Sequence, residues 1–168
     1  MRKEIYEMLC EQLSKLYVQP DGHHVVVEPV AEVPEGWERA IKHIDLWNHN
    51  VEFIEQEDQW ERPAVFVEFL PIQWRQVKTG SSISYTSRCR LSLHVVTDWH
   101  GSSSADSDFR EKSLEVFDLL TSIHLCLRGM SGQSFNGLDL VESLTNHNHD
   151  ELLENIEVYE CVAFKSLR

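Results

Sequence analysis

The histidines are the side chains best suited to metal chemistry in this sequence, and two of them form an H-x-H pair. His147 and His149 are followed directly by Asp150. On a strand this spacing would place both imidazoles on one face, where they could chelate a metal. The surrounding residues are instead typical of a polar turn, and no HExxH or cysteine-rich partner motif accompanies them. We expect no bound metal, and His147 and His149 are the ligands to test if one exists.

The sequence lacks the patterns of nucleophilic and nucleotide chemistry. The Gly/Ser-rich stretches near Gly80 and Gly129 do not match G-x-S-x-G. Gly101-Ser-Ser-Ser precedes an expected helix but lacks the lysine and the second glycine of a phosphate-binding loop. Acidic pairs such as Glu57-Asp58 lie in polar segments, without the desolvation that shifts a catalytic pKa. We therefore expect no enzymatic activity, no catalytic residue and no cofactor.

Tryptophan and arginine side chains are the better candidates for function, because they are common anchors of protein interfaces. Trp74 and Arg75 lie in the connection that follows an apolar strand, with Lys78 close behind. Arg88 and Arg90 fall on the outward face of the next strand. These five residues form the predicted contact patch. The alternative is that Trp74 covers one end of this domain's own core.

Composition narrows the class of protein and of partner. The length of 168 residues predicts one domain over 1–168. The formal charge of −13, from 15 basic and 28 acidic residues, disfavours generic binding to nucleic acid or to acidic membranes. No apolar run approaches about 18 residues, so we expect no membrane span. The four cysteines form no CxxC and the N-terminus has no apolar signal region, which predicts reduced thiols in the cytoplasm.

Hydrophobic periodicity predicts an α/β fold of the α+β type. We expect a mixed or mainly antiparallel sheet with two main helices packed on one face. The elements follow the order helix, strand or strands, strand, strand, helix, strand, strand. The expected ranges are a first helix at 2–17, strands at 63–70 and 88–97, a second helix at 108–128, and strands at 138–144 and 155–164.

Some local details can also be predicted. Cys89, Leu91, Leu93 and Val95 alternate with polar residues and should face a core. Asp108 with Glu111 resembles a capping box, with Asp106 as an alternative cap, and Gly129 should end the helix. The apolar stripe of that helix is expected to consist of Phe109, Val116, Phe117, Leu120, Ile123, His124 and Leu127.

The remaining segments are less regular. Residues 18–60 are interpreted as an irregular, insertion-like segment with short strands at 25–27 and 51–54. Residues 72–85, which contain Thr79-Gly-Ser-Ser82, are interpreted as a long polar hairpin loop or arm. A long polar loop inside a compact domain is usually functional.

The element order, together with Pro63-Ala-Val-Phe-Val-Glu-Phe69 and the alternating Arg90-Leu-Ser-Leu-His-Val-Val96, resembles the tail terminator and tail-completion proteins of long-tailed bacteriophages. Leu46-Trp-Asn-His-Asn50 adds to the resemblance, which extends over about residues 2–165. It implies a non-enzymatic, prophage-derived structural protein without a cofactor. Such proteins form a hexameric ring that caps the tail tube and contacts head-completion proteins. The segment at 18–60 departs from the simplest members.

Three hypotheses follow. The first is a tail-terminator-type ring protein, in the host cytoplasm or in the virion tail, whose partners are its own copies, tail-tube and head-completion proteins. By the resemblance, residues 73–85 would be the arm that reaches a neighbour or the tube lumen. The second is a stand-alone α/β module with a protein or small-molecule partner. The third is a metal-dependent hydrolase that uses the turn at His147 and His149.

Overall fold

The computed structural model describes residues 1–168 except 29–31, 49–59, 80–81, 147–150 and 168. The expected strand at 51–54 therefore lies outside the described residues. In chain order the elements are α1 (Arg2–Leu13), β1 (Leu16–Val18), β2 (His24–Val26), β3 (Glu38–Arg39), β4 (His43–Leu46), β5 (Ala64–Phe69), β6 (Arg75–Thr79), β7 (Ser82–Asp98), α2 (Arg110–Leu127), β8 (Phe135–Asn146) and β9 (Leu152–Leu167).

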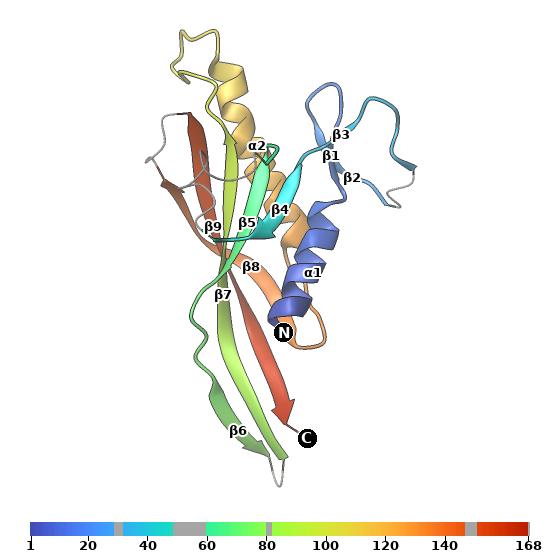
Figure 1. Ribbon diagram of the computed structural model, residues 1–168, viewed down its shortest axis with the longest axis vertical. Coiled ribbons are helices and arrows are strands. Elements are labelled where there is room, and N and C mark those ends of the chain that lie inside the picture. Colours follow the sequence, from blue (N-terminus) through green and yellow to red (C-terminus); the bar gives the residue numbers. More distant parts are fainter. Residues whose placement is uncertain (29–31, 49–59, 80–81, 147–150, 168) are drawn as a thin grey trace.

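The main sheet confirms the expected α+β fold with a mixed sheet. Its strand order is β4-β5-β7-β9-β8, and β6 pairs separately with β7. The β4–β5 pair is parallel and the other pairs are antiparallel. Strands β7 and β9 pair continuously from Asp98 and Leu152 at one end to Ile83 and Leu167 at the other. These two strands form the long axis of the molecule (Figure 1).

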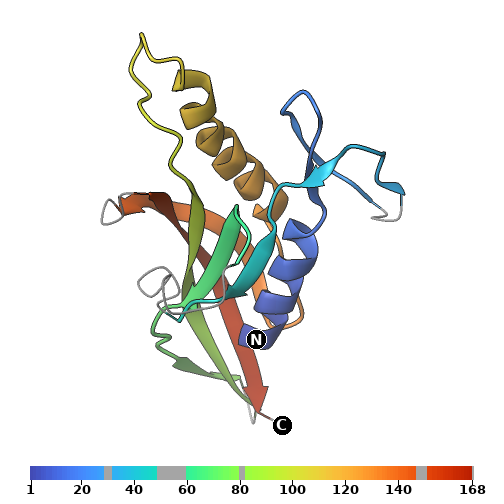
Figure 2. The ribbon, with the colours of Figure 1, turned by 45° about the horizontal axis from the view of Figure 1, so that its top comes forward.

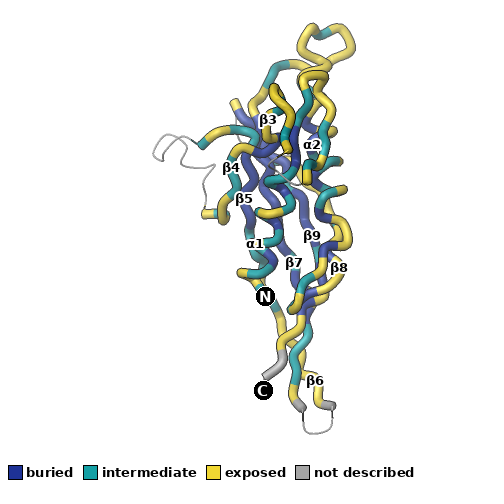
Figure 3. The backbone as a smooth tube through the Cα atoms, turned by 90° about the vertical axis from the view of Figure 1, so that its right-hand side faces the viewer, coloured by how far each residue is buried: buried dark blue, intermediate teal, exposed yellow. Residues whose placement is uncertain are grey.

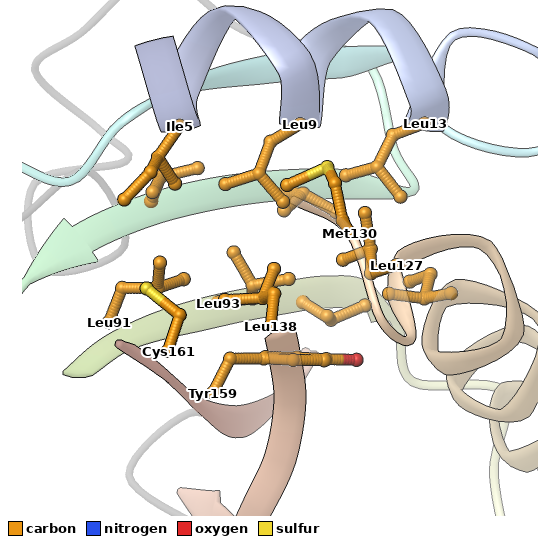
Figure 4. Close-up of a cluster of buried hydrophobic side chains, with 14 of the residues drawn as sticks. Ile5, Leu9, Leu13, Leu91, Leu93, Leu127, Met130, Leu138, Tyr159 and Cys161 are labelled. Carbon is orange, nitrogen blue, oxygen red and sulfur yellow. The ribbon is translucent and has the colours of Figure 1, made fainter. Parts of the chain in front are cut away.

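One face of this sheet carries the main core, as the alternation in β7 predicts. Leu91 and Leu93 are fully buried, and α1 packs over them through Ile5, Leu9 and Leu13 (Figure 4). Helix α2 and strand β9 contribute to the same cluster. Burial of a large aliphatic or aromatic side chain favours folding by about 1.5–3 kcal/mol, so this cluster accounts for the position of both helices.

A smaller cluster covers the upper part of the opposite face. Ala64, Phe66, Val96 and Leu152 are buried there, and Trp47 and Trp60 pack against them. Strand β5 is therefore buried on both faces, which its nearly continuous apolar sequence predicts.

The N-terminal third is more regular than expected. Helix α1 ends at Leu13, so the predicted range 2–17 is four residues too long, and Leu16 belongs to β1. Strand β1 pairs with β2 and β3 in a three-stranded sheet, and β4 joins the edge of the main sheet. The expected strand at 25–27 is present as β2, one residue earlier, whereas β1, β3 and β4 were not expected. The short β-branched and aromatic runs gain stability from pairing, which a local pattern does not reveal.

Helix α2 also differs at its start and along its surface. Phe109 is the N-cap residue and no side chain caps the helix, so the capping predictions for Asp108 and Asp106 are wrong. Phe109 and Phe117 are exposed, whereas Leu119 is buried. The expected C-terminal glycine is confirmed, because Gly129 has a φ of +75°.

The other ranges are longer than predicted. Strand β8 spans Phe135–Asn146 and β9 spans Leu152–Leu167. Most of the expected loop at 72–85 is a β-hairpin, formed by β6 and the start of β7.

Among the described residues, no helix is long and apolar enough to cross a membrane. All four cysteines are free thiols, and Cys89 and Cys161 are buried opposite each other on β7 and β9.

Candidate interaction surface

The hairpin continues the main sheet beyond the helices, and we call this extension the arm. It consists of β6, the first five residues of β7 (82–86) and the last four of β9 (164–167), paired side by side. The arm lies at the lower end of the molecule in Figure 1, below α1, and its described residues are largely exposed in Figure 3. Because β7 and β9 continue from the core without a break, the core sheet positions the arm.

The arm differs in charge from the rest of this acidic chain. Between Glu68 and Asp98 the sequence contains no acidic residue, and none follows Glu160. Arg75 and Lys78 are exposed on β6, and Lys165 is exposed on β9. None of these three cations forms an ion pair with another described residue. The arm is therefore a basic projection on a protein with a net charge of −13.

Large apolar side chains accompany these cations. Val77 is 38% exposed, Ile83 37% and Phe164 41%. On an isolated chain such side chains expose apolar surface to water at a cost in free energy, and clusters of them commonly mark interaction sites. The mixture of apolar and cationic groups fits a protein partner.

Trp74 precedes the arm and lies at its junction with the body. Its side chain is 39% exposed and lines an open hollow with Met1, Arg2, Ile72 and Phe164. Trp74 thus borders residues at the start of α1 and is also partly exposed to solvent. The hollow joins the arm to the N-terminus of the chain.

Arg88 and Arg90 lie on a different part of the surface from Lys78. The Arg90 Nη2 atom lies 2.8 Å from Glu142 Oε2, and the Arg88 Nη1 atom lies 3.5 Å from Glu160 Oε1. Both arginines therefore have carboxylate partners on β8 and β9. The register places Val162 beside Arg88 on the same face, and its side chain is 50% exposed. The structure thus divides the five predicted contact residues into two groups. Trp74, Arg75 and Lys78, on or beside the arm, have no ion-pair partner among the described residues, whereas Arg88 and Arg90 on the sheet are ion-paired.

A buried polar cluster on the sheet was not predicted. The imidazole of His94 lies between two carboxylates, with Nδ1 2.6 Å from Glu154 Oε1 and Nε2 3.3 Å from Glu68 Oε2. The Asn146 side-chain amide donates to the other oxygen of Glu154 at 2.6 Å. Trp47 stacks on the His94 ring. His94 and Glu154 are far apart in sequence, and the one available signal was a histidine within an apolar strand.

Glu4 connects the first helix to the loop that precedes β8. Its carboxylate accepts hydrogen bonds from the Ser134 hydroxyl and from the backbone N–H of Gln133. The hydrogen bond from Ser134 is the main reason why the pKa of Glu4 is lowered, since it favours the charged form. This contact fixes the start of α1 beside the hollow that Trp74 lines.

The histidine pairs do not assemble a site in the described part of the chain. His147 and His149 lie outside the described residues, so their metal-binding role stays a prediction. Within the described ranges, no group of three potential ligands is placed to hold a metal. His24 lines a groove of about 540 Å³ between α2 and the three-stranded sheet, and burial lowers its pKa. Charged groups of both signs, including Arg39, Lys112 and Asp118, line this groove.

Comparison with solved structures adds a distant likeness. No protein-family model matches the sequence, and no curated protein matches it. A chain of the solved structure titled "Virion of native gene transfer agent (GTA) particle" overlays with a TM-score of 0.41 and 8% identity, covering 74% of this chain and 79% of that one. A likeness of this degree carries no argument about function, so any functional proposal depends on the chain itself.

Proposed function

We propose that this chain is a non-enzymatic structural protein that assembles with copies of itself through the arm. The observation that supports this most directly is the arm itself, which projects from the core. It carries exposed apolar side chains and cations that have no ion-pair partner among the described residues. A projection of this kind buries little within its own chain. It would gain stability by docking on a neighbour.

The resemblance of the sequence to phage tail terminators makes the proposal more specific. In this form the assembly is a homo-oligomeric ring, a hexamer by that resemblance, which caps a phage or prophage tail tube and contacts head-completion proteins. The arm corresponds to the segment at 73–85 for which the resemblance implies contact with a neighbour. The three-stranded, preformed construction of the arm supports a structural role, because it can present a surface without folding on contact.

Native mass by light scattering over a concentration series tests the proposal. One chain has a mass of 19.6 kDa, and the wild type should form a species several times heavier at high concentration. The variant Trp74→Ala/Arg75→Ala should shift this species towards single chains. Trp37→Ala/Arg39→Ala changes the same residue types on and beside β3 and serves as the matched control, with circular dichroism to verify folding. A wild type that stays a single chain at every concentration would contradict self-assembly.

A further inference from the structure

Helix α2 and the loop before it carry a surface that complements the arm. Five exposed carboxylates are concentrated there: Asp106, Asp108, Glu111, Glu115 and Asp118. None of them forms an ion pair with another described residue. Arg110, Lys112 and Arg128 are also exposed on or beside this helix, but the carboxylates outnumber them. A surface with a net negative charge attracts a basic partner.

The same surface is also apolar on the side that faces away from the core. Phe117 is 58% exposed and Leu125 66% exposed, two helical turns apart. The buried side chains of the helix lie on the other side, at Val116, Leu119, Ile123 and Leu127. Glu111 and Asp118 precede Leu125 at seven-residue steps, so all three lie along one line of the helix surface. Carboxylates and apolar side chains thus share this side of α2. We call the four residues Glu111, Phe117, Asp118 and Leu125 the acidic stripe.

The arm and the acidic stripe cannot meet within one chain. The arm lies at the lower end of the molecule, whereas the loop before α2 lies at the upper end and α2 runs from there to the middle (Figures 1 and 2). The main sheet separates them along its full length, since β7 leads from the arm at Ile83 to Asp98 near the start of the loop. A contact between the two surfaces therefore requires two molecules.

We propose that the acidic stripe of one copy is the docking site for the arm of the next. This inference depends on the proposed self-assembly and names the receiving surface. The register places Lys78, Ile83 and Lys165 on one face of the arm. Lys78 and Lys165 would face Glu111 and Asp118, while Ile83 would contact Leu125. Each chain holds both halves of this interface, so the contact is heterologous and generates a closed ring or an open filament. Because the charges are exposed, assembly should weaken as salt is raised.

Charge reversal on each half tests the pairing. Lys78→Glu/Lys165→Glu reverses the charge of one face of the arm, and Glu111→Lys/Asp118→Lys reverses the acidic stripe. Each variant alone should be a single chain at concentrations where the wild type assembles. A mixture of the two should assemble with alternating chains, because the reversed arm matches the reversed stripe and the wild-type arm matches the wild-type stripe. The variant with all four substitutions should recover assembly. Circular dichroism and thermal unfolding verify that each variant folds.

The outcomes separate this inference from the proposal on which it depends. If the wild type assembles and the reversed stripe leaves its mass unchanged, the docking site is wrong while self-assembly stands. If the wild type never assembles, self-assembly itself is wrong. Binding of a labelled duplex DNA oligonucleotide provides a further test. If it binds the wild type and the variant with the reversed stripe, but not the variant with the reversed arm, the partner of the arm is a nucleic acid and the inference is overturned.

Discussion

The indole of Trp47 lies flat on the imidazole of His94, with ring centroids 3.8 Å apart and an angle of 5° between the planes. This stack joins β4 to the central strand β7 across β5. We expect Trp47→Ala to lower the free energy of unfolding by about 2 kcal/mol, since a partly buried aromatic contact is lost. Urea denaturation followed by circular dichroism measures the change. Trp99→Ala is the control, because Trp99 is 50% exposed and its removal should cost less than about 0.5 kcal/mol.

His94 and Glu154 should be coupled energetically, because both are buried and their side chains are 2.6 Å apart. His94→Leu alone should destabilise the fold by about 3 kcal/mol, as it leaves the buried carboxylate without the imidazole. Glu154→Met alone should also destabilise. The double variant should cost less than the sum of the two, by about 1–3 kcal/mol in a double-mutant cycle. Additive effects would show that the two groups do not depend on each other.

Glu4 should make stability depend on pH. Its pKa is lowered from the ordinary value of 4.5 in the folded chain, chiefly by the hydrogen bond from Ser134. The ionised carboxylate therefore stabilises the fold above its unfolded pKa, and this contribution is lost as pH falls through the folded pKa. Glu4→Gln should cost about 1 kcal/mol at pH 7 and progressively less below pH 4.5.

Chemical denaturation at several pH values measures this difference. Glu7→Gln on the same helix is the matched control, since Glu7 is exposed and contacts Lys3 at 3.6 Å. An equal loss for Glu4→Gln at pH 7 and pH 3 would show that the carboxylate charge is not the cause.

Gly132 should not tolerate a side chain. A Cβ atom there would lie 2.6 Å from the Phe135 ring and would overlap the Glu4 carboxylate. Phe135 is fully buried and cannot move away without a shift of the core. We expect Gly132→Ala to lower the thermal midpoint, with a cost of about 1–3 kcal/mol. Gln133→Ala at the next, exposed position should have a much smaller effect, and equal midpoints for the two variants would refute the close packing.

Most of the core could be predicted because its signal is local. The alternation through Leu91 and Leu93 identified the buried face of β7, and the apolar run of β5 identified a strand covered on both sides. The start of β7 could not be predicted. Ser82-Ile-Ser-Tyr-Thr-Ser87 has the composition of a loop, and it is a strand because β6 and the end of β9 pair with it. Such pairing joins residues about 80 positions apart, which no local pattern records.

The candidate surface was predicted only in part. Trp74 and Arg75 were identified by residue type, and the structure places them at the arm. Arg88 and Arg90 were grouped with them, although each forms an ion pair on the sheet, Arg88 with Glu160 and Arg90 with Glu142. The exposed Phe117 was assigned to the core, because a helical stripe drawn from hydrophobicity alone does not distinguish the side that faces a partner. The absence of acidic residues between Glu68 and Asp98 could have indicated the basic arm earlier.

The unbroken pairing of β7 with β9 has a mechanical consequence. The same two strands that form the centre of the core also form the middle of the arm, from Val95 down to Ile83. A pull on the arm would be carried by the covalent backbones of both strands, and it would load their hydrogen bonds to β5 and β8 in shear instead of opening them one after another. The molecule can therefore carry tension from its projecting end directly into its centre.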